Sequence, residues 1–123
     1  MVALALGEPG APAVDRWLAL HERRVASSLL EAEVHSALRR ERLKPAHGLL
    51  EPIEWIMPDR PLTREIEFSL AAGYLRGSDL WHVACALYAS AGRSEEMTFL
   101  TLDIRQRVVA AKLGFATRGF TPE

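Results

Sequence analysis

The chain has 123 residues, of which 49% are hydrophobic and 25% charged, and its 15 basic and 16 acidic side chains leave a net charge of −1. This ordinary composition excludes a disordered, collagen-like or coiled-coil protein, and the near-zero charge provides no overall electrostatic footprint for a nucleic acid. The single cysteine, Cys85, excludes a disulfide scaffold.

The apolar stretches are too short for a membrane protein. None approaches the ~20 consecutive apolar residues that a bilayer requires. The first residues, MVALALGEPG, lack the basic region of a secretory leader. We therefore expect one domain over residues 1–123, without a membrane segment, in the reducing cytoplasm.

The first part of the chain predicts helices around one short strand. Apolar residues at helical spacing predict a helix over 11–23, and a β-type run follows at 24–27. Ser28 and Glu31 have the spacing of a capping box, S-x-x-E, which predicts a helix that runs to about Arg42.

The rest of the chain alternates between the two kinds of element. Pro45 begins a helical piece, and the segment around Trp55 is a further candidate strand. The later expected elements are a helix over 62–72, a helix from the N-cap Ser78 to Gly92, a strand over 97–102, a helix over 104–113 and a strand over 115–117. Because strands that alternate with helices pair in parallel, the sequence predicts an α/β sandwich with helices on both faces of a small sheet.

Three acidic residues lie near predicted strand ends or helix starts. Asp103 directly follows strand 97–102, Asp79 lies in a first helical turn, and Glu33 lies in the helix after strand 24–27. Ligands of open α/β sheets bind at the carboxyl ends of the strands, so we expect these side chains to share a cleft. Converging carboxylates repel one another, and Mg²⁺ or Mn²⁺ relieves that repulsion better than zinc, which prefers nitrogen and sulfur.

Each of these residues also has a structural interpretation. Asp79 favours the helix dipole, and Asp103 is a common N-cap residue type. Glu33 borders the apolar face of its helix, where an unpaired carboxylate is costly to desolvate. His82 and Cys85 are interpreted as packing residues, because two ligands do not make a zinc site.

Three blocks of the chain resemble the PIN-domain fold, particularly VapC-type toxins of bacterial and archaeal toxin–antitoxin pairs. They are LEAEVHSALRR at 30–40, GSDLWHVACAL at 77–87 and FLTLDIRQRVVAAKLGF at 99–115. The resemblance implies a three-layer α/β/α sandwich with a small, mainly parallel sheet. It also implies a homodimer that cleaves RNA with Mg²⁺ or Mn²⁺ and whose cleft is masked by a cognate antitoxin.

The resemblance also assigns roles to individual residues. Glu33 matches the second acid of the family, Asp79 the third and Asp103 the fourth, and Thr101 matches the hydroxyl residue that orients a ligand or water. From the residues themselves, Arg39 and Arg40, or Arg105 and Arg107 in the third block, are candidate contacts for RNA phosphates. The basic run 39–44 is otherwise a solvated helix end.

The beginning of the chain departs from the family pattern. PIN domains open with a strand that ends in an Asp, followed within two residues by Ser or Thr. Residues 2–18 are similar instead to the helix and loop that come after this strand. We therefore expect the first catalytic Asp and a central strand to be missing, which describes either a shortened chain or a degenerate relative.

Two other functions compete with the nuclease. A catalytically silent PIN-like module would act only by binding a protein partner or its own copy, and the missing Asp motivates it. A flavodoxin-like signalling domain with Asp103 as phospho-acceptor is weaker, because no acidic dipeptide lies near an N-terminal strand.

Overall fold

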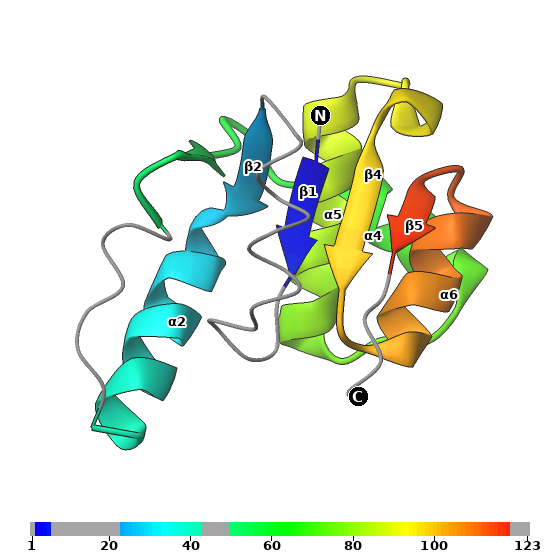
Figure 1. The fold of residues 1–123 in the computed structure, drawn as a ribbon. Coiled ribbons are helices and arrows are strands. Elements are labelled where there is room, and N and C mark those ends of the chain that lie inside the picture. Colours follow the sequence, from blue (N-terminus) through cyan, green and yellow to red (C-terminus); the bar gives the residue numbers. More distant parts are fainter. Residues whose placement is uncertain (1, 6–22, 43–49, 119–123) are drawn as a thin grey trace.

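Five short strands form one parallel sheet within residues 2–5, 23–42 and 50–118, the parts of the chain that this computed structural model describes (Figure 1). The strands are β1 (Val2–Ala5), β2 (Arg24–Ser27), β3 (Ile53–Ile56), β4 (Thr98–Thr101) and β5 (Ala116–Arg118). Their spatial order is β3-β2-β1-β4-β5, and every neighbouring pair is parallel. The predicted parallel α/β architecture is confirmed.

Helices cover both faces of this sheet, which gives three layers. The helices among the described residues include α2 (Ser28–Arg40), α4 (Thr63–Ala72), α5 (Gly77–Ser90) and α6 (Ile104–Lys112), with a 3₁₀ turn, η1, at Ser94–Glu96. Helices α4, α5 and α6 pack on one face, and α2 packs on the other. In the described residues, no helix is long and apolar enough to cross a membrane.

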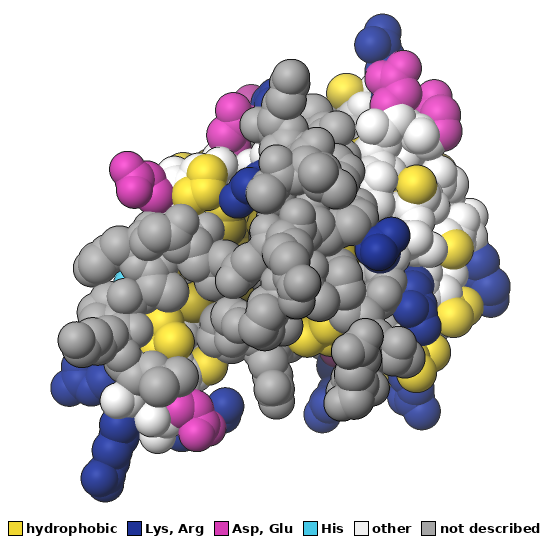
Figure 2. All heavy atoms as spheres, in the orientation of Figure 1, with side chains coloured by type: hydrophobic (Ala, Val, Ile, Leu, Met, Phe, Trp, Pro, Cys, Tyr) yellow, Lys and Arg dark blue, Asp and Glu magenta, His cyan; other side chains and the backbone are white. Residues whose placement is uncertain are grey.

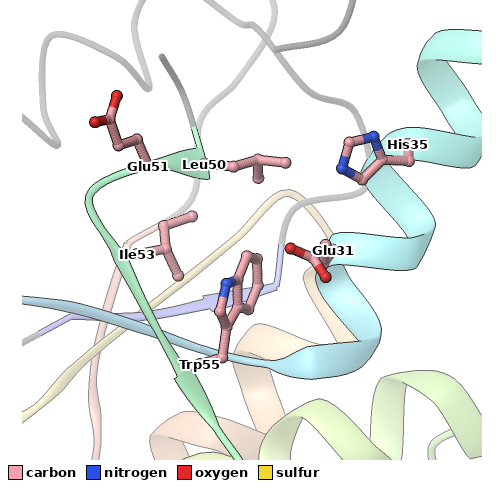
Figure 3. A pocket seen from close by; sticks show the side chains of 6 residues that line it. All are labelled: Glu31, His35, Leu50, Glu51, Ile53 and Trp55. Carbon is pink, nitrogen blue, oxygen red and sulfur yellow. The ribbon is translucent and has the colours of Figure 1, made fainter. Parts of the chain in front are cut away.

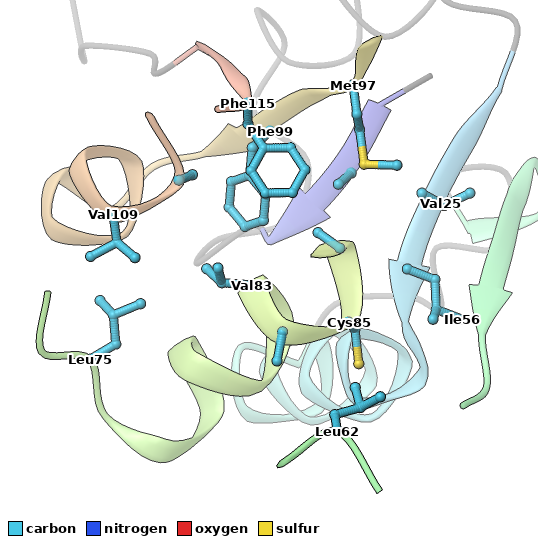
Figure 4. Close-up of a cluster of buried hydrophobic side chains, with 14 residues drawn as sticks. Val25, Ile56, Leu62, Leu75, Val83, Cys85, Met97, Phe99, Val109 and Phe115 are labelled. Atoms are coloured by element: carbon cyan, nitrogen blue, oxygen red, sulfur yellow. The ribbon is translucent and has the colours of Figure 1, made fainter. Parts of the chain in front are cut away.

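The core is divided by the sheet into two clusters, because successive side chains of a strand point to opposite faces. On β4, Phe99 enters the first cluster, with α5 and α6, and Leu100 enters the second, with α2 (Figure 4 shows the first). Both side chains are fully buried. Ala3 and Leu4 of β1 divide between the clusters in the same way.

The expectation that a central strand is missing was wrong. β1 lies in the middle of the sheet, where Ala3 is in register with Val25 of β2 and with Phe99 of β4. Two neighbouring strands and two apolar clusters stabilise this segment, and none of these contacts is local in sequence. The predicted helix over 11–23 lies outside the described residues, apart from Arg23, and so does the helical piece at Pro45.

Two of the predicted helix caps were also wrong. α2 begins at Ser28 with Ser27 at the N-cap position, and no side chain caps it. α5 begins at Gly77, one residue before the expected cap Ser78, and again has no side-chain cap. The other predicted elements agree with the structure to within about two residues at their ends, which is the usual uncertainty of element boundaries.

Candidate functional site

Three acidic side chains come from elements that meet at the carboxyl edge of the sheet, the lower edge in Figure 1. α2 follows β2 directly and carries Glu33, Asp103 follows β4, and Asp79 lies in the first turn of α5. The pKa of Asp79 is raised, first by burial and then by the negative charge of Asp103, with a smaller contribution from Glu33. Asp79 is therefore within electrostatic reach of both other carboxylates, and the predicted common cleft stays a prediction.

Asp79 has the most unusual environment of the three. Its side chain is half-buried, and within the described residues no hydrogen bond or ion pair to its carboxylate is formed. Electrostatic interactions with His82 and Arg76 lower its pKa without outweighing burial and the charge of Asp103. A partly desolvated carboxylate without a partner is typical of a binding or catalytic group.

Asp103 is held by a small hydrogen-bond network at the end of β4. Its Oδ1 accepts the backbone N–H of Gln106 at 2.9 Å, and its own N–H donates to Thr101 Oγ1 at 3.0 Å. The structural interpretation of Asp103 as the N-cap of α6 is thus confirmed. Because only Oδ1 takes part in the cap, this role leaves Oδ2 available to a ligand.

The same network connects the two aspartates. Gln106 is buried; its Oε1 accepts the Thr101 hydroxyl at 2.5 Å, and its Nε2 donates to the backbone carbonyl of Asp79 at 3.1 Å. Gln106 therefore fixes the start of α5 against the start of α6. Sequence reasoning missed this residue, because an uncharged side chain in an amphipathic helix gives no signal of a cross-helix role.

Glu33 lies at the border of the buried face of α2, and its carboxylate is paired. Its side chain is 42% exposed. Its Oε1 contacts His82 Nε2 at 2.5 Å, and Nδ1 of the same ring is 2.8 Å from Ser27 Oγ. His82 is thus buried, as the packing interpretation expects, but it is also bonded at both nitrogens.

The set Ser27, His82 and Glu33 resembles the residue types of a hydrolase triad, but its geometry does not support nucleophilic catalysis. Ser27 is only 2% exposed, so a substrate cannot reach its hydroxyl. Nearby Cys85 is fully buried, and burial raises the pKa of its thiol to about 12, which excludes a thiolate ligand or nucleophile at neutral pH.

Basic side chains lie on both sides of the acidic residues. Arg105 follows Asp103 by two positions and is exposed. Arg39 and Arg40 are exposed at the end of α2, about 9–10 Å along the helix axis from Glu33. Lys and Arg side chains gather at the lower edge of Figure 2, over the end of α2 and around α6.

The donor set fits a hard divalent cation by its chemistry. It consists of carboxylates that repel one another, with oxygen atoms of Asp79 and Asp103 not used by protein partners. In the described residues, however, no three His, Cys, Asp or Glu side chains stand close enough together to hold a metal ion. Glu33 is the acid whose side chain is drawn away, toward His82.

A pocket of about 500 Å³ lies elsewhere, between α2 and β3 (Figure 3). Its lining residues are Glu31, His35, Leu50, Glu51, Ile53 and Trp55. None of the three acids of the carboxyl edge lines it, so we do not assign it to the same site.

Comparisons with protein-family models, curated proteins and solved structures found no match. A functional assignment therefore depends on the site itself and on the resemblance of the three sequence blocks.

Proposed function

We propose that the chain is a Mg²⁺- or Mn²⁺-dependent endoribonuclease of the VapC toxin type, in which Glu33, Asp79 and Asp103 hold the ion. The observation that carries this proposal is the half-buried, unpartnered carboxylate of Asp79, whose pKa is raised first by burial and then by the charges of Asp103 and Glu33. Neighbouring carboxylates whose repulsion is not fully offset by His82 and Arg76 favour a cation between them. The family resemblance is independent support for the same three residues.

The bound ion would supply an activated water and would stabilise charge that develops on a phosphodiester. Neighbouring residues hold the two aspartates in place. Thr101 and Gln106 hold Asp103 at the end of β4, and Gln106 fixes the backbone of Asp79. Arg105, and Arg39 and Arg40 farther along α2, would contact the phosphates on either side.

The same proposal includes the partners of such a toxin. RNA would be the substrate, a cognate antitoxin would mask the carboxyl edge, and two copies would pair through helical faces in the cytoplasm. The basic side chains around the acidic edge support an anionic substrate, because they offset the repulsion that three carboxylates exert on a phosphate backbone.

A catalytically silent binding module is the second candidate, and one observation favours it. Asp103 already caps α6, Glu33 is bonded to His82, and no three acids stand together in the described residues. Such a protein would form a stable dimer or a complex with a partner and would cleave nothing.

The deciding experiment is RNA cleavage in the presence of Mn²⁺, of Mg²⁺ and of EDTA. We expect cleavage that requires the metal and that is lost in Asp79→Asn, because the amide cannot supply a negatively charged ligand. Asp59→Asn is the matched control: Asp59 is exposed, and among the described residues its carboxylate accepts only the Tyr88 hydroxyl, at 3.1 Å.

The two candidates predict different outcomes. Full cleavage by Asp79→Asn would contradict the nuclease site. The absence of cleavage under all three conditions, together with a dimer or a hetero-complex in sedimentation, would favour the silent module.

A further inference from the structure

The pocket between α2 and β3, which we call the α2–β3 pocket, has an apolar floor. Leu50 and Ile53 are buried there, and Trp55 of β3 is half-buried with its indole ring turned into the space between β3 and α2 (Figure 3). The same tryptophan packs against the second apolar cluster, so the core fixes its position. At about 500 Å³, the space lies within the size range of ligand-binding pockets and is larger than one side chain requires.

The rim of the α2–β3 pocket carries negative charge. Glu31 and His35, one turn apart on α2, and Glu51, just before β3, are exposed and line the opening. In the described residues neither glutamate forms an ion pair or a hydrogen bond through its side chain, and no Lys or Arg lines the pocket. Because α2 has no side-chain cap, the predicted capping box does not engage Glu31 either.

An aromatic ring, an aliphatic floor and two unpaired carboxylates together fit an organic cation on an apolar stem. The face of an indole ring attracts a cation, and in proteins that cation is more often a guanidinium than an ammonium group. A guanidinium group also forms paired hydrogen bonds with carboxylates such as those of Glu31 and Glu51. Leu50 and Ile53 would cover the methylene groups of the stem. An anion would be repelled by the rim, and a hydrated metal ion would gain nothing from the apolar floor.

The pocket also lies at an edge of the sheet. β3 is the outermost strand in the order β3-β2-β1-β4-β5, and in the described residues it pairs only with β2. The outer side of an edge strand presents backbone groups to which an extended segment of another chain can bind. A side chain of such a segment would reach the neighbouring pocket, which favours a peptide over a free small cation.

We propose that the α2–β3 pocket binds an arginine side chain from an extended, basic segment of a partner protein. Trp55 stacks on the guanidinium group, and Glu31 and Glu51 pair with it. None of the three acids of the carboxyl edge lines this pocket, so the proposal does not depend on the proposed nuclease.

The test compares two N-acetylated and C-amidated peptides, Ser-Val-Arg-Val-Ser and the same sequence with citrulline in place of arginine. Citrulline has the shape of arginine but no charge. Isothermal titration calorimetry measures their binding to the unmodified chain in about 0.1 M salt, where exposed charges more than about 10 Å apart are largely screened. We expect the arginine peptide to bind at least about 10-fold more tightly, because citrulline lacks the charge for both carboxylates and for the indole ring.

Variants of the rim and floor locate the binding. Glu31→Gln and Glu51→Gln should each weaken binding of the arginine peptide about 2–5-fold, as expected for exposed charge pairs. Trp55→Leu should weaken it by a similar factor. Glu95→Gln is the matched control: it removes the same charge from an exposed residue of η1 that does not line the pocket, and binding should not change.

Circular dichroism melting separates a loss of fold from a loss of affinity. Trp55 packs against the core, whereas Glu31 and Glu51 are exposed, so the two glutamate variants keep the test decisive if Trp55→Leu does not fold. Unchanged binding in both folded glutamate variants would place the peptide elsewhere and overturn the proposal.

The peptides themselves give further outcomes. Equal affinities of the arginine and citrulline peptides, or an effect of Glu95→Gln as large as that of the rim variants, would overturn the assignment of the pocket to a cation. If n-butylguanidinium binds as tightly as the arginine peptide, the occupant is a free organic cation and the peptide segment is wrong. The absence of binding by all three probes at millimolar concentration would also overturn the proposal, and RNA cleavage by the chain would be unaffected by any of these results.

Discussion

At the scale of single residues, the surroundings of Asp79 disfavour the ionised form of its carboxyl group. Burial and the neighbouring carboxylates raise its pKa above the ordinary value of 3.8. The folded chain therefore binds a proton more tightly than the unfolded chain does. It follows that the contribution of Asp79 to stability is most favourable below its unfolded pKa and falls as the pH rises through the folded pKa.

We predict that Asp79→Asn increases the stability of the metal-free protein at neutral pH, because it removes a charge that costs free energy. The gain should be modest, since Asp79 is only half-buried, and it should disappear below about pH 3, where the carboxyl is protonated in both states. Urea unfolding in EDTA at the two pH values measures the difference. A variant less stable than the original at neutral pH would show that the carboxylate makes stabilising contacts.

The sequence predicted the acids of the candidate site but not their hydrogen-bond partners. Asp79 and Asp103 were found because residues that follow strands or begin helices are placed at one edge by any parallel sheet. The contacts of His82 were not, because Ser27 is 55 residues away and Glu33 is 49 residues away in the chain. A helical histidine in an apolar stretch has the same pattern whether it only packs or also forms a hydrogen bond to a carboxylate.

At the scale of elements, Gly114 determines how the chain leaves α6 and enters β5. Its φ is +100°, in the left-handed region that favours glycine, and an added Cβ would lie 2.6 Å from Ser94 Oγ. That hydroxyl donates to the carbonyl of Leu113 at 2.8 Å. The turn delivers the buried ring of Phe115 to Phe99, with 5.8 Å between the ring centroids.

We predict that Gly114→Ala destabilises the protein by about 2 kcal/mol, roughly half from the positive φ and half from displacing the Ser94 hydroxyl. Gly92→Ala is the matched control, because Gly92 has a φ of +83° but nothing within 4 Å of the added Cβ. It should cost only about 1 kcal/mol. Chemical denaturation compares the two, and equal losses would show that the contact with Ser94 has no energetic effect.

A helix or strand was predictable where its own residues favour that conformation. Residues 24–27, which have a β-type sequence, form β2 with the predicted bounds, and the apolar run around Phe99 forms β4. β1 was not predicted, because VALA is equally compatible with a helix. Its extended form depends on pairing with β2 and β4, which lie about 20 and 100 residues away along the chain.

At the scale of the whole molecule, the sheet separates two apolar clusters that are built from different side chains. Phe99 and Leu100 are adjacent on β4, yet each is fully buried in a different cluster. Trp81 packs against the first cluster and Trp55 against the second. The chain is expected to behave as one domain, and these two tryptophans make that expectation testable from both sides of the sheet.

We predict that Phe99→Ala and Leu100→Ala each destabilise the entire chain, by about 3–5 and 2–5 kcal/mol respectively, in one cooperative transition. Each substitution removes contacts on one face only, but β4 pairs with β1 and β5, so neither cluster can persist after the strand is lost. Variants that keep only Trp55 or only Trp81 let fluorescence follow each cluster separately, and circular dichroism follows the helices. Coincident urea transitions would establish a single cooperative unit. A Trp55 transition that precedes the Trp81 transition in Leu100→Ala would show instead that the α2 face unfolds independently.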